Sequence, residues 1–238
     1  MKRLFVRGLW GDELVHKRKY NTNLEMESIK KNQYNEPFIT YVFGKENYKF
    51  CKSFGHECVL IDDNPSPYDL IKHHYRHKLE IFKIAMNDCY EMVFMDWDCI
   101  PQKKLPSNFW DVLGKREIFQ ANLTRYRVGK ATWREDSYSR RLIPNAGFVY
   151  MRDKSLPEKI INYWEYIESY KASAEPPLAK LVDNITGGWK GMDTYWNLFE
   201  PDFCNLRNRS PFSSSKRKTK NQCFIHNHGG RTKVPKCQ

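Results

Sequence analysis

Two aspartates separated by one residue follow a short apolar segment of this chain. Residues 91–95 read Glu-Met-Val-Phe-Met, which predicts a buried strand, and Asp96-Trp97-Asp98 comes directly after them. Two carboxylates this close repel each other, and a divalent cation relieves the repulsion. Carboxylate oxygens suit Mg²⁺ or Mn²⁺, which in turn bind phosphates. The motif therefore predicts a metal site for the phosphates of a nucleotide, while the alternative is that both aspartates only form a turn or cap a helix.

Strand and helix patterns alternate through the first hundred residues. Strands are predicted over residues 3–7, 37–43, 57–61 and 91–95, and helices over 23–34, 45–54 and 67–89, with Gly55 as a left-handed helix end. This alternation predicts an α/β fold with a central, mostly parallel sheet flanked by helices on both faces. Ligands of such sheets bind beyond the carboxyl ends of the strands, where Asp96 and Asp98 are expected to lie.

The second half of the chain has a less regular pattern. Strands are predicted over residues 117–123 and 145–151, a loop or hairpin over 124–141, and a helix over 155–170 that has Pro157 in its first turn. Neither an internal repeat nor a linker stands out. We therefore expect one domain that spans residues 1–238.

Composition and hydropathy argue against a disordered chain and against a membrane-spanning one. The hydrophobic content of 40% and the aromatic content of 15% indicate a folded chain and not a disordered one. No apolar run reaches the length of a membrane span. Met1 is not followed by the pattern of a signal peptide, and the seven cysteines form no Cys-x-x-Cys pair. We therefore expect reduced thiols and a cytoplasmic location, in the host cytoplasm if the chain is viral.

The positive charge is concentrated toward the C-terminus. The formal net charge is +12, and residues 203–238 contain no Asp or Glu. The cations of this stretch are Arg207, Arg209, Lys216, Arg217, Lys218, Lys220, Arg231, Lys233 and Lys236. Such a one-sided charge attracts phosphates or polyanions. The alternative is a solvated tail, particularly at the Ser-Ser-Ser-Lys-Arg-Lys stretch of residues 213–218.

Five features in a fixed order resemble the GT-A glycosyltransferases, most closely the glycogenin-like retaining families. They are Lys78 before the apolar strand, Asp96-Trp97-Asp98 after it, Pro144-Asn145-Ala146-Gly147, the Gly-rich segment 187–191 that leads to Asp193, and His226 three residues before Gly229 with Lys233 following. The resemblance implies a single GT-A, Rossmann-like domain. Residues 1–100 would bind the nucleotide-sugar, and residues 101–238 would bind the acceptor and supply a C-terminal basic loop that closes the site.

The resemblance also implies a metal centre and a set of catalytic residues. Asp98 would bind Mn²⁺ or Mg²⁺ directly, Asp96 would share the metal or hold the ribose, and His226 would be the third ligand, with His228 as its rival. The candidate catalytic residues are Asp193 near the reacting sugar carbon, Asn145 at the sugar hydroxyls and Lys78 at the diphosphate or sugar. The competing interpretation of Asp193 is a residue that complements a helix dipole.

The remaining candidate contacts bind the donor. Val6, Gly8 and Trp10, at the end of the first strand, are expected at the base and ribose, and Gly147 lets the backbone approach the sugar. Gly229 and Lys233 would close over the diphosphate. Two details depart from the family: Thr194 follows Asp193 where relatives often have Gln, and Lys233 lies one residue later than the pattern.

The predicted function is transfer of a sugar from a nucleoside-diphosphate sugar, a UDP-sugar before others, to an acceptor hydroxyl, with retention of configuration. Arginines and aromatic residues interleave within residues 125–141, which suits a nucleic acid such as modified DNA as acceptor. A glycan or protein acceptor is the slightly preferred alternative. Two other classes stay open: a metal-dependent nucleotidyltransferase, and a non-catalytic module that binds polyanions or glycans.

Overall fold

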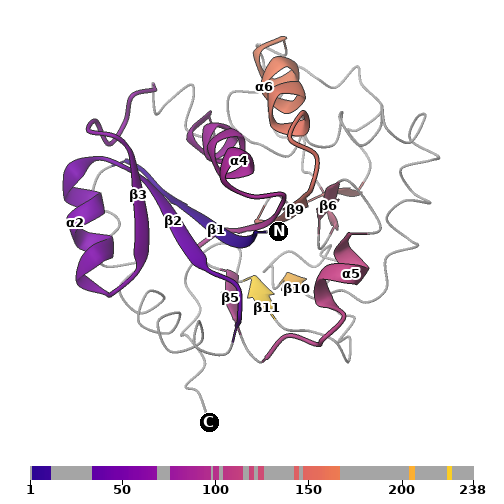
Figure 1. Ribbon diagram of the computed structural model, residues 1–238. Coiled ribbons are helices and arrows are strands. Elements are labelled where there is room, and N and C mark those ends of the chain that lie inside the picture. Colours follow the sequence, from indigo (N-terminus) through magenta and orange to yellow (C-terminus); the bar gives the residue numbers. More distant parts are fainter. Residues whose placement is uncertain are drawn as a thin grey trace.

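The main sheet has the parallel core that the sequence predicts. The computed structural model describes residues 2–11, 34–68, 76–97, 99–101, 104–114, 118–120, 123–125, 142–144, 147–166, 204–206 and 224–226. Six strands pair in the order β3-β2-β1-β4-β9-β6 (Figure 1). Their bounds are β1 Arg3–Leu9, β2 Phe38–Phe43, β3 Glu57–Asp62, β4 Glu91–Met95, β6 Ile118–Gln120 and β9 Phe148–Met151. Strand β9 is antiparallel to both of its neighbours, β4 and β6, and so points opposite to the other five strands.

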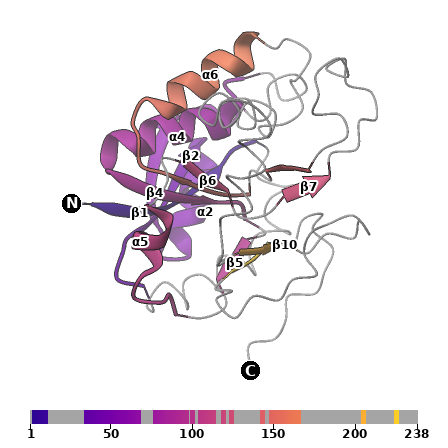
Figure 2. The ribbon, with the colours of Figure 1, turned by 90° about the vertical axis from the view of Figure 1, so that its right-hand side faces the viewer.

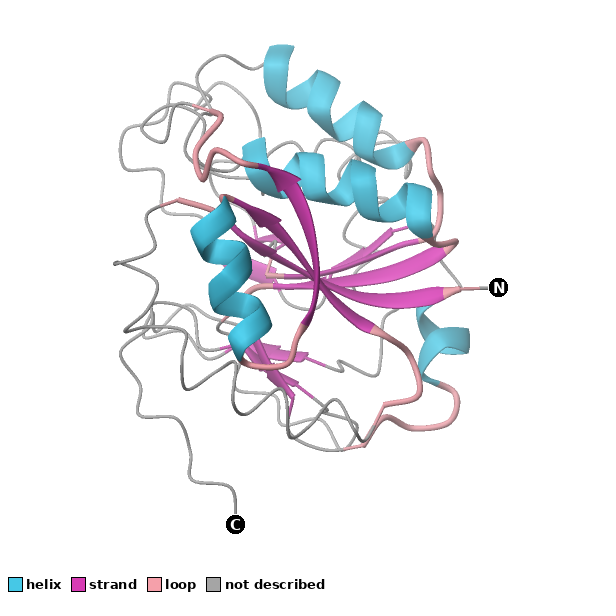
Figure 3. Cartoon of the chain, turned by 60° about the vertical axis from the view of Figure 1, so that its left-hand side comes forward, coloured by secondary structure: helices cyan, strands magenta, loops and turns pink. Residues whose placement is uncertain are grey.

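Helices cover both faces of this sheet. Helices α4 (Arg76–Asp88) and α6 (Leu156–Tyr166) lie together on one face, and α2 (Lys45–Ser53) and α5 (Phe109–Leu113) pack on the other (Figures 1 and 3). The side chains of β1 alternate accordingly: Val6 belongs to the core under α4 and α6, whereas Phe5 packs with α5 and Leu9 with α2. Burial on both faces explains why the strands read as apolar runs.

A smaller sheet lies on the α5 side of the main sheet. Strands β5 (Cys99–Pro101), β10 (Cys204–Leu206) and β11 (Phe224–His226) pair in the order β10-β11-β5. A further pair, β7 (Leu123–Arg125) and β8 (Leu142–Pro144), is antiparallel. Figure 2 shows β5, β7 and β10 toward the side at which β1 ends. The carboxyl edge of the parallel strands is therefore the edge next to which these short strands gather.

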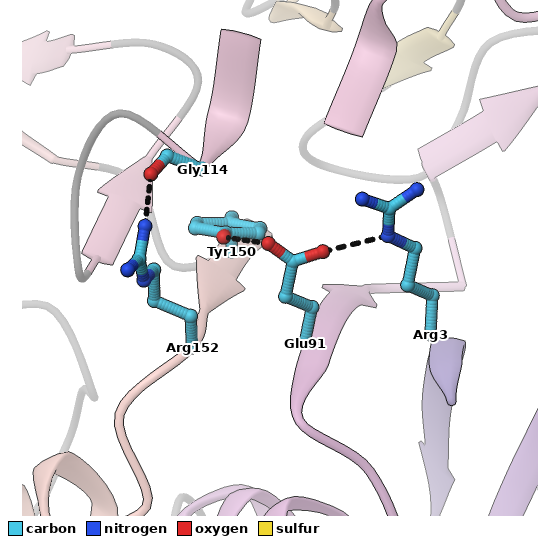
Figure 4. Close-up of polar contacts among 5 residues, drawn as sticks. All are labelled: Arg3, Glu91, Gly114, Tyr150 and Arg152. Carbon is cyan, nitrogen blue, oxygen red and sulfur yellow. Dashed lines mark hydrogen bonds and ion pairs between the residues drawn. The ribbon is translucent and has the colours of Figure 1, made fainter. Parts of the chain in front are cut away.

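The opposite edge of the sheet is closed by a polar network around Glu91 (Figure 4). Its carboxylate accepts hydrogen bonds from Arg3 Nε at 2.7 Å and from the Tyr150 hydroxyl at 2.8 Å. Arg152 Nη1 donates to the carbonyl of Gly114 nearby. Glu91 is 4% exposed, so both partners satisfy a buried charge. This network is structural and lies at the amino end of β4, away from Asp96.

Most predicted elements are confirmed, and one boundary is wrong. Gly55 has φ 74° and ends the α2 segment as expected. The helix predicted from about residue 67 does not include its first two residues, because Pro67 and Tyr68 are bends; residues 69–75 fall outside the described residues, and the described helix is Arg76–Asp88. Two Asx turns precede this segment: the Asn64 amide donates to Asp62 Oδ1, and the Ser66 amide donates to Asn64 Oδ1.

Several other predicted elements differ in extent or cannot be compared. The strand predicted over residues 117–123 is described as β6 and the first residue of β7. The strand predicted over 145–151 is described from Phe148, and the helix over 155–170 as α6. The helix predicted over residues 23–34, apart from Tyr34, falls outside the described residues. No helix in the described ranges is long and apolar enough to cross a membrane.

Candidate active site

A four-residue turn at the carboxyl end of β4 carries the two aspartates. The backbone N–H of Asp96 donates to the carbonyl of Gly147 at 2.8 Å, and the N–H of Cys99 donates to the carbonyl of Asp96, also at 2.8 Å. The second bond joins residues i and i+3 and so defines a β-turn. Asp98 falls outside the described residues. The bond to Gly147 brings the start of β9 beside Asp96.

Lys78 and Asp96 form an ion pair across the end of the sheet. Lys78 Nζ, from helix α4, lies 2.6 Å from Asp96 Oδ1, and the two side chains are 2% and 30% exposed. The same ammonium lies 5.1 Å from the centroid of the Phe94 ring. A buried lysine that is held against a partly exposed carboxylate supplies positive charge where phosphates of a nucleotide are expected.

The end of β1 lies against the same turn. Trp97 Nε1 donates to the carbonyl of Gly8 at 2.5 Å. A Cβ on Gly8 would overlap Ile81 Cδ1 and would lie 2.7 Å from Trp10 Cζ3, so only glycine lets α4 and Trp10 approach β1 this closely.

Trp10 is held by the helix that also carries Lys78. The ring of Trp10 stacks on His77, with centroids 5.6 Å apart and planes inclined by 3°. His77 is fully buried and packs edge-to-face with Phe43 and with Tyr68, with ring centroids 5.0 Å apart in each pair. Val6 lies inside the sheet, because its side chain is in the core and its backbone pairs with β2 and β4. Of these three residues, Gly8 contacts the turn, through the hydrogen bond from Trp97, and Trp10 lies beyond the end of β1 against His77.

The pairing of β5 with β11 connects the segment of His226 to the residues that follow the aspartates. The register of these antiparallel strands sets His226 opposite Cys99, the residue that follows Asp98. Carboxylate oxygens with one imidazole nitrogen form a donor set that Mn²⁺ accepts, and Mg²⁺ accepts the carboxylates. The described residues contain no group of three His, Cys, Asp or Glu able to hold a metal. Asp98 lies outside them, and only the backbone of His226 is described.

The other predicted site residues cannot be located. Asn145, Asp193, His228, Gly229 and Lys233 fall outside the described residues.

One residue of this region, Arg7, has no counterpart in the sequence prediction. It is 0% exposed, donates from Nη2 to the carbonyl of Cys99 at 2.5 Å, and lies 5.0 Å from the centroid of the Trp97 ring. The signal in the sequence is an arginine within the otherwise apolar stretch 4–9, flanked by Val6 and Gly8.

Comparison with solved structures finds glycosyltransferases. The galactosyltransferase LgtC, in complex with donor and acceptor sugar analogues, matches with a TM-score of 0.50 and 14% identity, over 96% of this chain and 87% of that one. Mouse xyloside xylosyltransferase 1, in its apo form, matches with a TM-score of 0.51 and 10% identity, over 98% of this chain and 99% of that one. No family model matches the chain, and no curated protein matches it in sequence.

The similarity identifies the class of fold. At these identities it shows that the chain has a GT-A-like glycosyltransferase fold, with a mostly parallel central sheet flanked by helices. The resemblance read from the sequence motifs is confirmed at this level.

Proposed function

We propose that this chain is a metal-dependent glycosyltransferase that moves a sugar from a nucleoside-diphosphate sugar, UDP-sugars before others, to an acceptor hydroxyl. The observation that carries the proposal is the β5–β11 register, in which His226 lies opposite Cys99, the last residue of the Asp96–Cys99 turn. The glycosyltransferase-like fold and the Lys78–Asp96 ion pair at the same edge of the sheet support it.

Asp96, Asp98 and His226 would hold Mn²⁺, or Mg²⁺ in its place. When bound, such a cation acts as a Lewis acid that stabilises the diphosphate leaving group. Lys78 adds a second positive charge beside the same phosphates, and its burial strengthens that charge because little water screens it. The ion pair with Asp96 keeps the ammonium in place before the charge of the leaving group develops. Lys233 and the backbone of Gly229 would close over the diphosphate.

The donor would lie along the carboxyl edge between β1 and β9. Trp10, held flat against His77, offers an aromatic surface for the base. At the other end, Gly147 next to Asp96 lets the backbone approach the sugar, and Asn145 would bind its hydroxyls.

Asp193 would be the carboxylate nearest the reacting carbon. If configuration is retained, as in glycogenin-like enzymes, no strong general base is needed; an inverting enzyme would use a carboxylate such as Asp193 as the base. The anomeric proton of the product, observed by NMR, distinguishes the two outcomes. We propose retention, and an inverted product would contradict the close family assignment.

We propose a glycan or protein as the acceptor and test DNA beside it. The acid-free segment 203–238 and the basic, aromatic stretch 125–141 are the sequence features that suit a polyanion. Retention of DNA affinity at physiological salt, followed by transfer of labelled sugar to a modified base, would favour a DNA acceptor over a glycan or protein.

The proposal is tested with a panel of nucleotide-sugars. Purified protein is incubated with each donor in Mn²⁺ or in EDTA, and nucleoside diphosphate release is measured, with Asp98→Ala as the matched control. We expect metal-dependent release that the variant loses. Release of pyrophosphate from a nucleoside triphosphate would instead indicate a nucleotidyltransferase. No turnover and no metal-dependent binding of UDP would leave a binding module and contradict the proposal.

A further inference from the structure

Arg7 is a permanently charged side chain in the centre of the fold. It lies on β1, the strand between β2 and β4, and is 0% exposed. An arginine does not lose its proton under these conditions, so the whole desolvation penalty of a cation is incurred here. An apolar residue would fill the same place at lower cost, which points to a role other than stability.

The contacts of Arg7 converge on the aspartate turn. Its Nη2 donates to the carbonyl of Cys99 at 2.5 Å, and its guanidinium lies 5.0 Å from the Trp97 ring centroid. The Phe38 ring lies 5.4 Å away and also contacts the cation. The next residue of β1, Gly8, accepts the hydrogen bond from Trp97 Nε1. Consecutive residues of β1 therefore hold Trp97 and Cys99, the two neighbours of Asp98.

Cys99 links this turn to the strand that carries His226. Its N–H closes the turn onto Asp96, its carbonyl accepts from Arg7, and its position in β5 is opposite His226 in β11. Displacement of the Cys99 carbonyl would shift both the third turn position and the register partner of His226.

We infer that Arg7 is a positioning residue, which fixes the Asp96–Cys99 turn and the β5–β11 pair so that the aspartates and His226 can share one metal ion. The metal part of this inference rests on the proposed function, whereas the role of Arg7 in holding the turn does not. The competing explanation is that Arg7 only fills the core between Phe38 and Trp97. The two explanations differ in how local order and global stability respond to a change at Arg7.

The test compares Arg7→Met with Arg3→Met, an arginine of the same strand that pairs with Glu91 at the opposite edge. Hydrogen–deuterium exchange is followed by mass spectrometry in peptides covering residues 96–101 and 38–43, and urea unfolding gives the global stability. In Arg7→Met we expect exchange at 96–101 to rise about tenfold, the effect of losing about 1.4 kcal/mol from a charged hydrogen bond. The urea midpoint should stay the same or rise, because apolar replacement of a buried charge is often neutral or stabilising.

Arg3→Met should give the reverse result, with a lower urea midpoint and no selective rise at residues 96–101. Arg7→Lys provides a second variant if Arg7→Met does not fold; it keeps the charge without the planar group and should show a smaller selective rise. Unchanged exchange at the turn, or a rise in step with that of residues 38–43, would overturn the inference. Mn²⁺ affinity, followed by electron paramagnetic resonance, should fall about tenfold in Arg7→Met and stay unchanged in Arg3→Met. If the wild type binds no Mn²⁺, the proposed function fails, and the exchange data still decide whether Arg7 holds the turn.

Discussion

The Lys78–Asp96 ion pair makes a sharp prediction because its two side chains are buried to different degrees. Two unit charges 2.6 Å apart attract each other by a gross energy of about 6 kcal/mol at an effective dielectric of 20. Desolvation offsets most of this attraction, because the burial of an ion as deep as Lys78 costs several kcal/mol. Asp96, which is 30% exposed, keeps part of its hydration. Removal of one charge should therefore have a different effect from removal of the other.

In Lys78→Met the remaining carboxylate can be hydrated, and the new side chain packs on Phe94, so the free energy of unfolding should fall by no more than about 1 kcal/mol. In Asp96→Asn the ammonium stays in a site that is 2% exposed while its carboxylate partner is replaced by an amide. This should cost about 3 kcal/mol, the lower end for a broken buried pair, because the amide oxygen still accepts a hydrogen bond.

The assay is urea unfolding of both single variants and of the double variant at pH 7. The double variant should resemble Lys78→Met, which gives a coupling energy of about 3 kcal/mol in the double-mutant cycle. Additive effects, or a greater loss in Lys78→Met than in Asp96→Asn, would refute the account of this pair. Both single variants should also lose donor turnover, since each alters the charge beside the diphosphate.

Three further variants or reactions test other parts of the structure. Gly8→Ala should lower the free energy of unfolding by about 1–3 kcal/mol, because the added Cβ overlaps Ile81. A variant as stable as the wild type would show that the close contact does not require glycine. Burial and the bond to Glu91 raise the pKa of Tyr150 above its ordinary value of 10.0, so this hydroxyl stabilises the fold below pH 10 and loses that effect as the pH rises further. Tyr150→Phe should therefore be about 1 kcal/mol less stable than the wild type at pH 7. Its urea midpoint should also decline less than that of the wild type between pH 9 and 11, and parallel curves for the two proteins would argue against this role of Tyr150. Burial raises the pKa of Cys89 to about 12, so iodoacetamide should modify this thiol at pH 9 only after unfolding, and rapid modification of the native protein would contradict its burial.

The strands and their order of appearance follow from local patterns in the sequence. The apolar segment 91–95 is fully buried on both faces, and Leu79, Phe82 and Met86 of α4 face the core at helical spacing. Gly55 follows α2 with a positive φ, which glycine adopts without strain because it has no Cβ. The bends at Pro67 and Tyr68 could not be predicted from the apolar spacing of the helix, which carries no signal for them.

The contacts that assemble the site depend on tertiary pairing and leave little local signal. Nothing in the residues around Cys99 indicates that His226 lies opposite it, because the two strands are far apart in the sequence. The Lys78–Asp96 pair forms where α4 crosses the end of β4, which spacing along the chain does not specify. Arg7 would be assigned to the surface by its residue type, yet its neighbours in the fold are Phe38 and Trp97.

The measurement that tests the central claim most directly is the binding of UDP by isothermal titration calorimetry, with Mn²⁺ or with EDTA, to the wild type and to Asp98→Asn. If the Asp96–Cys99 turn is the nucleotide site, the wild type binds UDP only when Mn²⁺ is present, and Asp98→Asn loses that binding while its urea midpoint is unchanged. UDP binding that is insensitive to both EDTA and Asp98→Asn would contradict the claim that this turn holds the metal and the diphosphate.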